Sequence, residues 1–240
     1  MSNPLSDSPH PADSAEHLIA AGKTVLQAQH LTFHIEGREG RTLWRNLDLS
    51  LHAGERLGVT GPSGSGKTLL LRTLAGLEPL QSGELTLDGR ALAHWSMPAY
   101  RARVVYVPQR PTLREGTVEA ALRAPFAFRL HRGHAFPEER VHTLLQALGR
   151  DDSFLRQRAE RLSVGEAQIA VMLRALLIDP DILLLDEPTA SLDAATVAII
   201  EQLISHWIAE QPDRACLWTS HDRAQLERVT DRLLTLKPAV

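Results

Sequence analysis

The stretch GPSGSGKT at residues 61–68 constrains the fold of this chain more than any other part of its sequence. It matches the pattern G-x-x-x-x-G-K-[ST], in which a glycine-rich loop holds phosphate oxygens with backbone N–H groups at the start of a helix. The context also fits, because the strand-like run RLGVT (56–60) precedes the loop and the apolar helical run TLLLRTLAGL (68–77) follows it. The sequence therefore predicts a strand–loop–helix unit with a phosphate site.

The residue types in this loop give each position an expected task. Gly64, Ser65 and Gly66 should turn successive N–H groups toward phosphate oxygens. Lys67 should reach the β- and γ-phosphates, and the Thr68 hydroxyl should bind Mg²⁺. The residues expected to contact the nucleotide are Gly61, Pro62, Ser63, Gly64, Ser65, Gly66, Lys67 and Thr68.

A pair of acids follows a second strand-like run. The continuous apolar stretch DILLLD (181–186) is typical of a strand covered on both faces. Asp186, at its end, should hold Mg²⁺ through water, and Glu187 should orient and deprotonate an attacking water. Such a pair is also common as a surface feature, but beside the Lys67 loop a catalytic role is favoured.

The remaining pattern predicts an α/β core. LDLSL (47–51) and ELTLDG (84–89) alternate with period two, which favours an antiparallel layer in the first half of the chain. A second doubly covered strand is expected in ACLWTS (215–220). Helices are expected near 137–149, 165–178 and 194–210, with a helical insertion at about 110–165.

Composition excludes several classes of protein. The chain has 240 residues, 43% hydrophobic and 23% charged, as soluble globular proteins do. Its formal charge of −3 provides no basic surface for nucleic acid. The single cysteine, Cys216, excludes an internal disulfide and is expected to be buried. No apolar run reaches the roughly 18 residues of a membrane span, so if the protein works at a membrane, another chain must supply the spans.

The N-terminal residues and several histidines indicate neither a secretory signal nor a metal site. Residues 1–24 lack the basic start and apolar core of a secretory signal and are interpreted as a disordered leader. His10, His131 and His134 have no carboxylate or cysteine at ligand spacing, so we expect solvated side chains rather than a metal site.

LSVGEAQ, at residues 162–168, resembles the Leu-Ser-Gly-Gly-Gln signature of the ATP-binding subunits of ABC transporters. With the two stretches described above, it makes the chain similar to that family over about residues 25–238. The resemblance implies an α/β fold that has a P-loop NTPase (RecA-like) core, an antiparallel β layer and an inserted helical subdomain. It implies an ATP-binding core at 25–109 and 166–238, and a helical subdomain at 110–165 that carries the signature.

The same resemblance implies a homodimer. Two copies would pair head to tail, and the signature of one would close over the ATP that the other holds. Ser163, Gly165 and Glu166 would then bind the partner's nucleotide. Asp193, in the stretch SLD (191–193), would cross the dimer interface and also belong to the nucleotide site.

Two further positions match the family. Gln109, after the strand-like run VVYV (104–107), would contact Mg²⁺ or the attacking water, and His221 would contact the γ-phosphate. The expected catalytic residues are thus Glu187, His221, Gln109 and Lys67, and the expected metal ligands are Thr68, Gln109 and Asp186.

Three positions depart from the family pattern. Val164 replaces the first glycine of the signature, and because valine disfavours a positive φ, its N–H can contact a phosphate only if φ is negative there. Ile169 stands where arginine is common. Ile35 occupies the place of the aromatic residue that usually stacks on adenine, with Phe33 and His34 as neighbouring substitutes.

The resemblance thus implies an ATPase that uses ATP and Mg²⁺, binds no nucleic acid and drives a separate multi-spanning permease from the cytoplasmic face of the inner membrane. The permease groove is expected near Gln109–Leu122, with Phe126 and Phe128 beside it. RPTLREGTVEAAL (110–122) and the closing segments are similar to ATPases of the iron-export type. A soluble ABC-type ATPase such as one for cluster assembly, an ATPase for lipoprotein release or nutrient import, and a regulator with little turnover remain alternatives.

Overall fold

The structure is a computed structural model that describes residues 22–35, 41–128 and 135–237. Most of the expected leader lies outside these ranges. At its end the expectation needs correction, because Thr24 already begins strand β1 rather than closing a leader.

One sheet is antiparallel and has the strand order β2-β1-β4-β5. The turn between β4 and β5 is formed by Asp88 (φ 49°) and Gly89 (φ 71°), the two left-handed residues that a tight hairpin requires. The alternating stretches at 47–51 and 84–89 do form strands of this sheet, as predicted. Its strands are β1 (Thr24–Ile35), β2 (Arg41–His52), β4 (Glu84–Leu87) and β5 (Arg90–Ala91).

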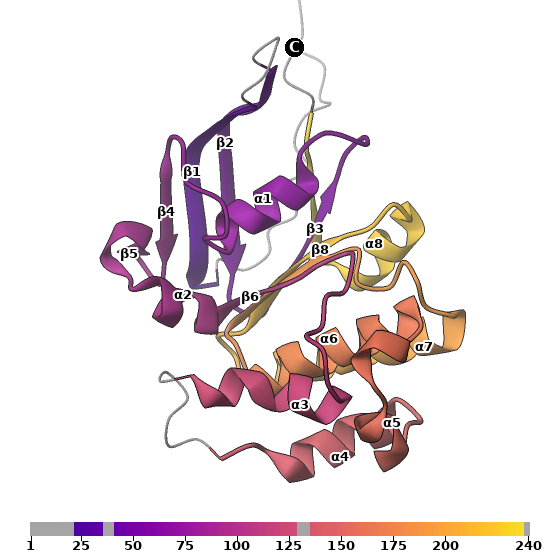
Figure 1. Cartoon of the computed structure of the whole chain (residues 1–240). Coiled ribbons are helices and arrows are strands. Elements are labelled where there is room, and N and C mark those ends of the chain that lie inside the picture. The colour runs from indigo at the N-terminus through magenta and orange to yellow at the C-terminus, as the bar shows by residue number, and fades with distance from the viewer. Residues whose placement is uncertain (1–21, 36–40, 129–134, 238–240) are drawn as a thin grey trace, which may run out of the picture.

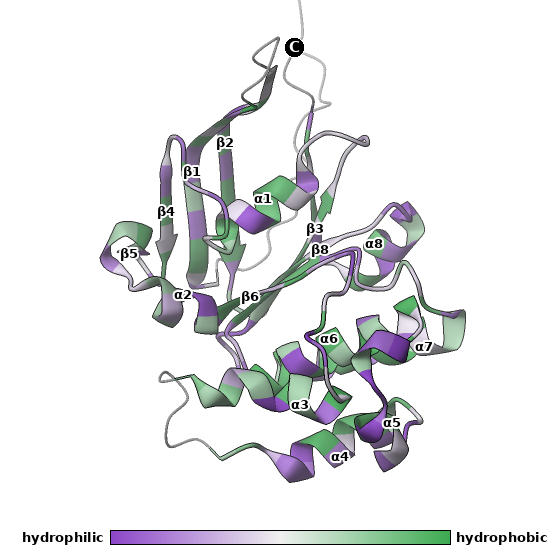
Figure 2. Cartoon of the chain, in the orientation of Figure 1, coloured by the Kyte–Doolittle hydropathy of each residue, from purple (hydrophilic) through white to green (hydrophobic). Residues whose placement is uncertain are grey.

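The other sheet is parallel and has the order β6-β7-β8-β3-β9. RLGVT (56–60) belongs to it as β3, although it directly follows β2 of the antiparallel sheet. Figure 2 shows the central strands of this sheet coloured predominantly hydrophobic. Its strands are β3 (Arg56–Thr60), β6 (Val104–Val107), β7 (Ile182–Asp186), β8 (Ala215–Thr219) and β9 (Arg232–Thr235).

The parallel sheet separates two hydrophobic cores. Along β7, Ile182 and Leu184 pack with the antiparallel sheet and α1, whereas Leu183 and Leu185 pack with the helices on the opposite face. This alternation follows from the period of two along a strand, and it explains why the run is apolar throughout.

Eight α-helices lie among the described residues, and α1 lies between the two sheets (Figure 1). α6 contacts both α3 and α4. Several of the helical turns fall within 110–165, but the division of the chain into core and helical subdomain stays a prediction. The helices are α1 (Lys67–Leu74), α2 (Met97–Arg103), α3 (Val118–Arg123), α4 (Glu138–Ala147), α5 (Asp152–Arg156), α6 (Val164–Ile178), α7 (Ala194–Glu210) and α8 (Arg223–Val229).

Leu184→Ala should destabilise the fold strongly, because this side chain is fully buried between the two sheets and its removal leaves a cavity. We expect a loss of about 2–5 kcal/mol in the free energy of unfolding, measured by urea denaturation. Leu77→Ala, at a side chain that is 42% exposed, is the control and should change stability by less than about 1 kcal/mol. Equal losses for both variants would contradict this packing.

Candidate functional site

Predicted site residues from four segments meet at one edge of the parallel sheet, whereas Ser163, Gly165, Glu166 and Asp193 lie at the starts of α6 and α7. Parallel strands present their carboxyl ends on the same side, so segments that follow them are brought together. The 61–68 loop follows β3, Gln109 comes after β6, Glu187 follows β7 and His221 comes after β8. Residues far apart in the sequence therefore share one site.

The 61–68 loop is closed around its own lysine. The Lys67 Nζ donates to the carbonyl oxygens of Gly61 (2.9 Å) and Pro62 (3.3 Å). Gly66 has φ 91°, and a Cβ there would lie 2.7 Å from Nε1 of Trp44, so both the backbone and the packing require glycine. The sequence prediction of a strand, a loop and a helix is confirmed here.

The start of α1 is suited to an anion. No acidic residue lies in its first turn and no side chain caps it, so its first N–H groups and its positive dipole end are uncompensated. Among the described residues, the buried Ser65 hydroxyl also has no hydrogen-bond partner. The Thr68 side chain is exposed at the same end of the helix. These groups fit the phosphates of a nucleotide.

Two hydroxyl groups hold the carboxylate of Asp186, which is 1% exposed. Its Oδ2 accepts from the Tyr106 hydroxyl and its Oδ1 from the Thr219 hydroxyl, each at 2.9 Å. Burial and the neighbouring Asp186 raise the pKa of Tyr106, which keeps that hydroxyl a donor. Asp186, Thr68 and Gln109 offer only oxygen ligands, which Mg²⁺ prefers, and their chemistry fits this ion.

Glu187 is the centre of the site. Its Oε2 accepts from Nε2 of Gln109 at 2.9 Å, and its Oε1 lies 2.7 Å from Nε2 of His221. Its backbone has φ 48°, a strained conformation for a non-glycine residue, and its N–H donates to the Thr219 hydroxyl at 3.0 Å. Gln109 and His221 thus fix the carboxylate and Thr219 fixes the backbone, although His221 was predicted to contact a γ-phosphate.

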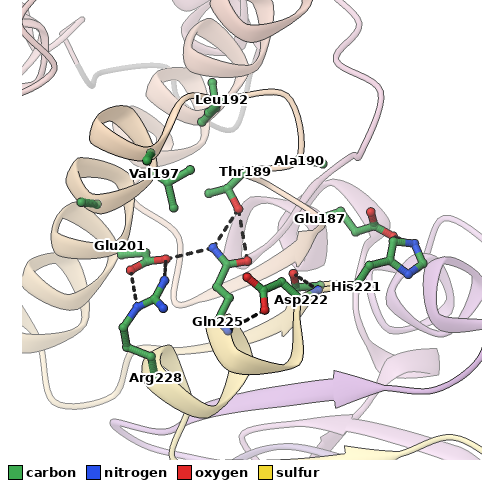
Figure 3. A pocket seen from close by; sticks show the side chains of 13 residues that line it. Glu187, Thr189, Ala190, Leu192, Val197, Glu201, His221, Asp222, Gln225 and Arg228 are labelled. Atoms are coloured by element: carbon green, nitrogen blue, oxygen red, sulfur yellow. Dashed lines mark hydrogen bonds and ion pairs between the residues drawn. The ribbon is translucent and has the colours of Figure 1, made fainter.

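A cavity of about 670 Å³ lies beside Glu187 and His221 (Figure 3). On its wall, the buried Gln225 amide donates to the Thr189 hydroxyl (3.0 Å) and to Oε1 of Glu201 (2.9 Å). Arg228 pairs with the same glutamate at 2.7 Å. This network joins the segment after β7 to α7 and α8, and so fixes how far apart the loops carrying Glu187 and His221 lie.

The 162–168 stretch forms the beginning of α6. Ser163 is the N-cap: its Oγ accepts from the N–H of Glu166, whose carboxylate accepts from the Ser163 N–H (3.0 Å) and hydroxyl (2.7 Å). These two donors lower the pKa of Glu166. Val164 is the first helical residue and has no positive φ, so valine is sterically acceptable there.

Gly165 is required by a close backbone contact. A Cβ at this position would lie 2.8 Å from the carbonyl oxygen of Ser191. The stretch 191–193 thus packs on the start of α6. Asp193, predicted to belong to the nucleotide site, caps α7 here by accepting from the N–H (3.0 Å) and hydroxyl (2.7 Å) of Thr196.

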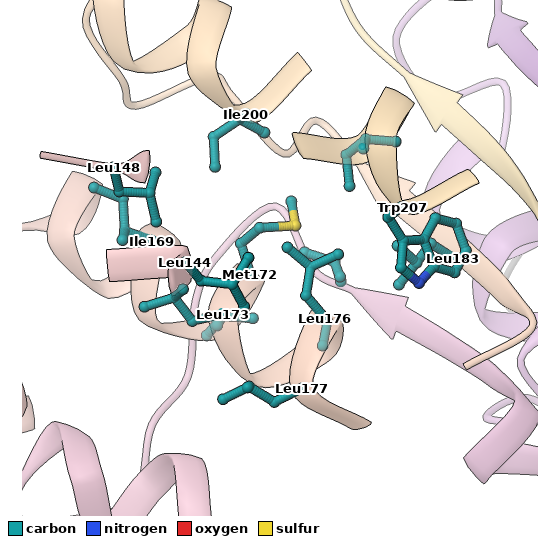
Figure 4. Packing of buried hydrophobic residues seen from close by; sticks show 14 of the residues in the cluster. Leu144, Leu148, Ile169, Met172, Leu173, Leu176, Leu177, Leu183, Ile200 and Trp207 are labelled. Atoms are coloured by element: carbon teal, nitrogen blue, oxygen red, sulfur yellow. The ribbon is translucent and has the colours of Figure 1, made fainter. Parts of the chain in front are cut away.

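The structure also places the residues that depart from the family pattern. Ile169 is 2% exposed and belongs to the helical core, where an arginine would need a partner (Figure 4). Phe33 is buried against Trp44, with ring centroids 5.3 Å apart, while His34 bonds Thr42. Ile35, 43% exposed, and His34, also exposed, are therefore the accessible candidates for an adenine contact.

Sequence reasoning missed Tyr106, Thr219, Thr189 and Gln225. No motif marks them, since each acts through a neighbour on another strand or helix. Cys216 is buried as predicted, and burial raises the pKa of its thiol to about 12. Within the described ranges no three His, Cys, Asp or Glu side chains gather as metal ligands would, and His10, His131 and His134 lie outside these ranges.

Comparison with known proteins agrees with this geometry. A family model described as ABC transporter matches residues 44–190. The chain is 34% identical to "Probable iron export ATP-binding protein FetA" of Escherichia coli over 194 residues, 80% of this chain and 84% of that protein. It is 34% identical to "Protein STAR1" of Oryza sativa subsp. japonica over 221 residues, 92% of this chain.

The chain is also 31% identical to "Fe(3+) ions import ATP-binding protein FbpC 2" of Pectobacterium atrosepticum over 200 residues, 82% of this chain. It spans only 62% of the rice protein and 57% of this import protein.

Two solved structures have similar folds. A dimeric bacterial ABC transporter cassette has a TM-score of 0.78 and 27% identity, covering 88% of this chain and 94% of that one. A dimeric post-hydrolysis state of such a cassette, bound to ADP and Pi, has a TM-score of 0.77 and 26% identity, with the same coverage.

Thr219→Val should destabilise the chain, because this buried hydroxyl serves both Asp186 and the N–H of Glu187. We expect a loss of about 1–3 kcal/mol in the free energy of unfolding, measured by chemical denaturation, since buried polar groups lose their partner. Thr143→Val, at an exposed position of α4, should change it by no more than about 0.5 kcal/mol. Equal stability of both variants would contradict the role of this hydroxyl.

Proposed function

Because the chain belongs to the ABC transporter family, in which it is an ATP-binding ATPase, we propose that it dimerises around ATP and drives a separate membrane permease. The observation that carries the proposal is the position of the Glu187 carboxylate. Gln109 and His221 hold its two oxygens at the edge of the parallel sheet from which the 61–68 loop also leaves.

In this proposal Lys67 exchanges partners when ATP binds. Its ammonium group leaves the carbonyl oxygens of Gly61 and Pro62 for the β- and γ-phosphates. Ser65 and the first N–H groups of α1 supply the remaining donors. Mg²⁺, when bound, neutralises charge on the β- and γ-oxygens, and Thr68, Asp186 and Gln109 are the residues that would hold it.

Glu187 acts as the general base. One of its oxygens must be released by Gln109 or His221 before it can accept a proton from water. The Thr219 hydroxyl keeps the Glu187 backbone in place during this exchange. His221, 62% exposed at its side chain, would leave its contact with Glu187 to reach the γ-phosphate, which stays a prediction from the sequence.

The second half of each ATP site comes from a second copy. Ser163 and the first N–H groups of α6 would contact the γ-phosphate of the partner's nucleotide, with Val164, 61% exposed, facing the interface. Gly165 keeps the 191–193 stretch and Asp193 packed beside this contact. Nucleotide binding in one copy is thereby coupled to the position of α6 in the other.

A groove beside the loop that follows Gln109 is the proposed permease site. A cavity of about 420 Å³ there is lined by Leu113, Ala121, Pro125 and Phe128, within or next to the predicted region. None of the helices in the described part of the chain has the length and apolar character needed to cross a bilayer. The relatives named as export and import ATP-binding proteins support the proposal that the permease is a separate chain and that this chain acts at the cytoplasmic face of the inner membrane.

Iron is the proposed cargo, and export the proposed direction. The similarity to the E. coli protein named for iron export supports both, whereas the relative named for iron import supports only the cargo. ATPase activity stimulated by iron in the reconstituted transporter would test the cargo. Failure to co-purify with any membrane chain would favour a soluble ABC-type ATPase.

Glu187→Gln should lower ATP turnover by about 10²–10⁴-fold, because the amide cannot accept the proton of water. ATP binding should persist, so the variant should accumulate as an ATP-bound dimer in light scattering. Glu139→Gln, at an exposed position of α4, is the matched control and should turn over normally. Turnover that is unchanged in Glu187→Gln would remove its assignment as the base.

A further inference from the structure

Asp186 is a buried acid without a cationic partner. The other two acids that are buried in the described part of the chain each have one. Glu55 lies 2.8 Å from Nε of Arg232, and Glu187 lies 2.7 Å from Nε2 of His221. No Lys, Arg or His of the described ranges forms such a pair with Asp186, although it is only 1% exposed. A buried charge without an opposite charge is costly, so this carboxylate is suited to a cation from solution.

The groups that hold Asp186 are both neutral hydroxyls. The Tyr106 hydroxyl donates to Oδ2 and the Thr219 hydroxyl to Oδ1, each at 2.9 Å. With one donor on each oxygen, the carboxylate is restrained from turning about its Cβ–Cγ bond. An ionised carboxylate has about four lone-pair sites, so about half of them remain for a metal ion or its water, and no partner neutralises the charge.

Tyr106 differs from Thr219 in having a single task. The Thr219 hydroxyl also accepts from the Glu187 N–H, so its removal disturbs the backbone as well. Within the described ranges, the Tyr106 hydroxyl bonds Asp186 alone. The Tyr106 ring packs against the core between the two sheets, and phenylalanine would keep that packing. Removal of the Tyr106 hydroxyl therefore changes the surroundings of Asp186 and leaves the remaining contacts of the site in place.

We propose that Tyr106 is a positioning residue of the metal site and sets its affinity for Mg²⁺. Its hydroxyl holds the Asp186 carboxylate in the orientation that receives the ion or the ion's water, without neutralising it. Tyr106 lies on β6, the edge strand of the parallel sheet, and acts through Asp186 rather than on the nucleotide. The inference rests on the proposed function and adds to it a residue that no sequence motif marks.

Tyr106→Phe should weaken metal binding by about 10-fold or more, because hydrogen-bond partners of a metal-binding carboxylate typically contribute about 10–100-fold to metal affinity. The affinity is measured by EPR titration with Mn²⁺, with ADP kept below the concentration of the chain so that all of the nucleotide is bound. The affinity for ADP without metal, measured by calorimetry, should not change.

Tyr100→Phe is the matched control, because it removes the hydroxyl of the chain's other tyrosine. That hydroxyl is buried and donates to the carbonyl oxygen of Leu74 at 2.6 Å. This variant should lower the melting temperature, since it leaves a buried carbonyl group unpaired, and should bind Mn²⁺ as the wild type does.

The Mg²⁺ dependence of turnover separates positioning from a merely structural role. Tyr106→Phe should need about 10-fold more Mg²⁺ for half-maximal ATP turnover, and its turnover should return to near the wild-type value at saturating Mg²⁺. A structural role would lower turnover at every Mg²⁺ concentration.

Each failure has its own meaning. If Tyr106→Phe binds Mn²⁺ as tightly as the wild-type chain, or if saturating Mg²⁺ does not restore its turnover, the inference is overturned and the proposed function stands. If the wild-type chain with bound ADP takes up no Mn²⁺, the proposed metal site fails and the inference fails with it.

Discussion

Asp186 and Thr219 occupy paired positions at the ends of β7 and β8, and the hydrogen bond between their side chains joins the two strands where the chemistry lies. The same threonine hydroxyl accepts from the N–H of Glu187. A slip of one residue in this register would turn these side chains to the opposite face of the sheet. The meeting of Gln109, Glu187 and His221 depends on this register.

The starts of α1 and α6, which we propose to bind phosphate, differ in which groups satisfy their first N–H groups. No acidic side chain lies in the first turn of α1, where the helix dipole is positive. Lys67 there donates hydrogen bonds to carbonyl oxygens, which the oxygens of a triphosphate can replace. At the N-terminal end of α6, the Glu166 carboxylate is already present and accepts hydrogen bonds from the N–H and hydroxyl groups of Ser163. The start of α1 can thus accept an anion from solution. In the proposed dimer, the start of α6 would have to exchange the Glu166 carboxylate for a phosphate of the partner's nucleotide.

The sequence alone predicted part of the fold and of the candidate site, but not all of either. The 61–68 loop and the runs at 182–186 and 215–219 were predictable, since their signal lies in consecutive residues. β1 was missed because its pairing with β2 is interrupted by several register shifts, which break the alternation. Contacts of Thr219 and Gln225 were missed because they depend on neighbours from other strands and helices. The family resemblance assigned Gly165 to the partner's nucleotide, but only the structure reveals the Ser191 carbonyl against it.

The most direct test of a pocket shared by two copies is a disulfide between them. Ser63→Cys and Val164→Cys place thiols at exposed positions of the 61–68 loop and of the α6 start, and the native Cys216 is buried. In the Glu187→Gln background, a shared pocket predicts disulfide-linked dimers that form with ATP and not without it. Chains that stay unlinked in the presence of ATP, although they bind it, would contradict the shared pocket.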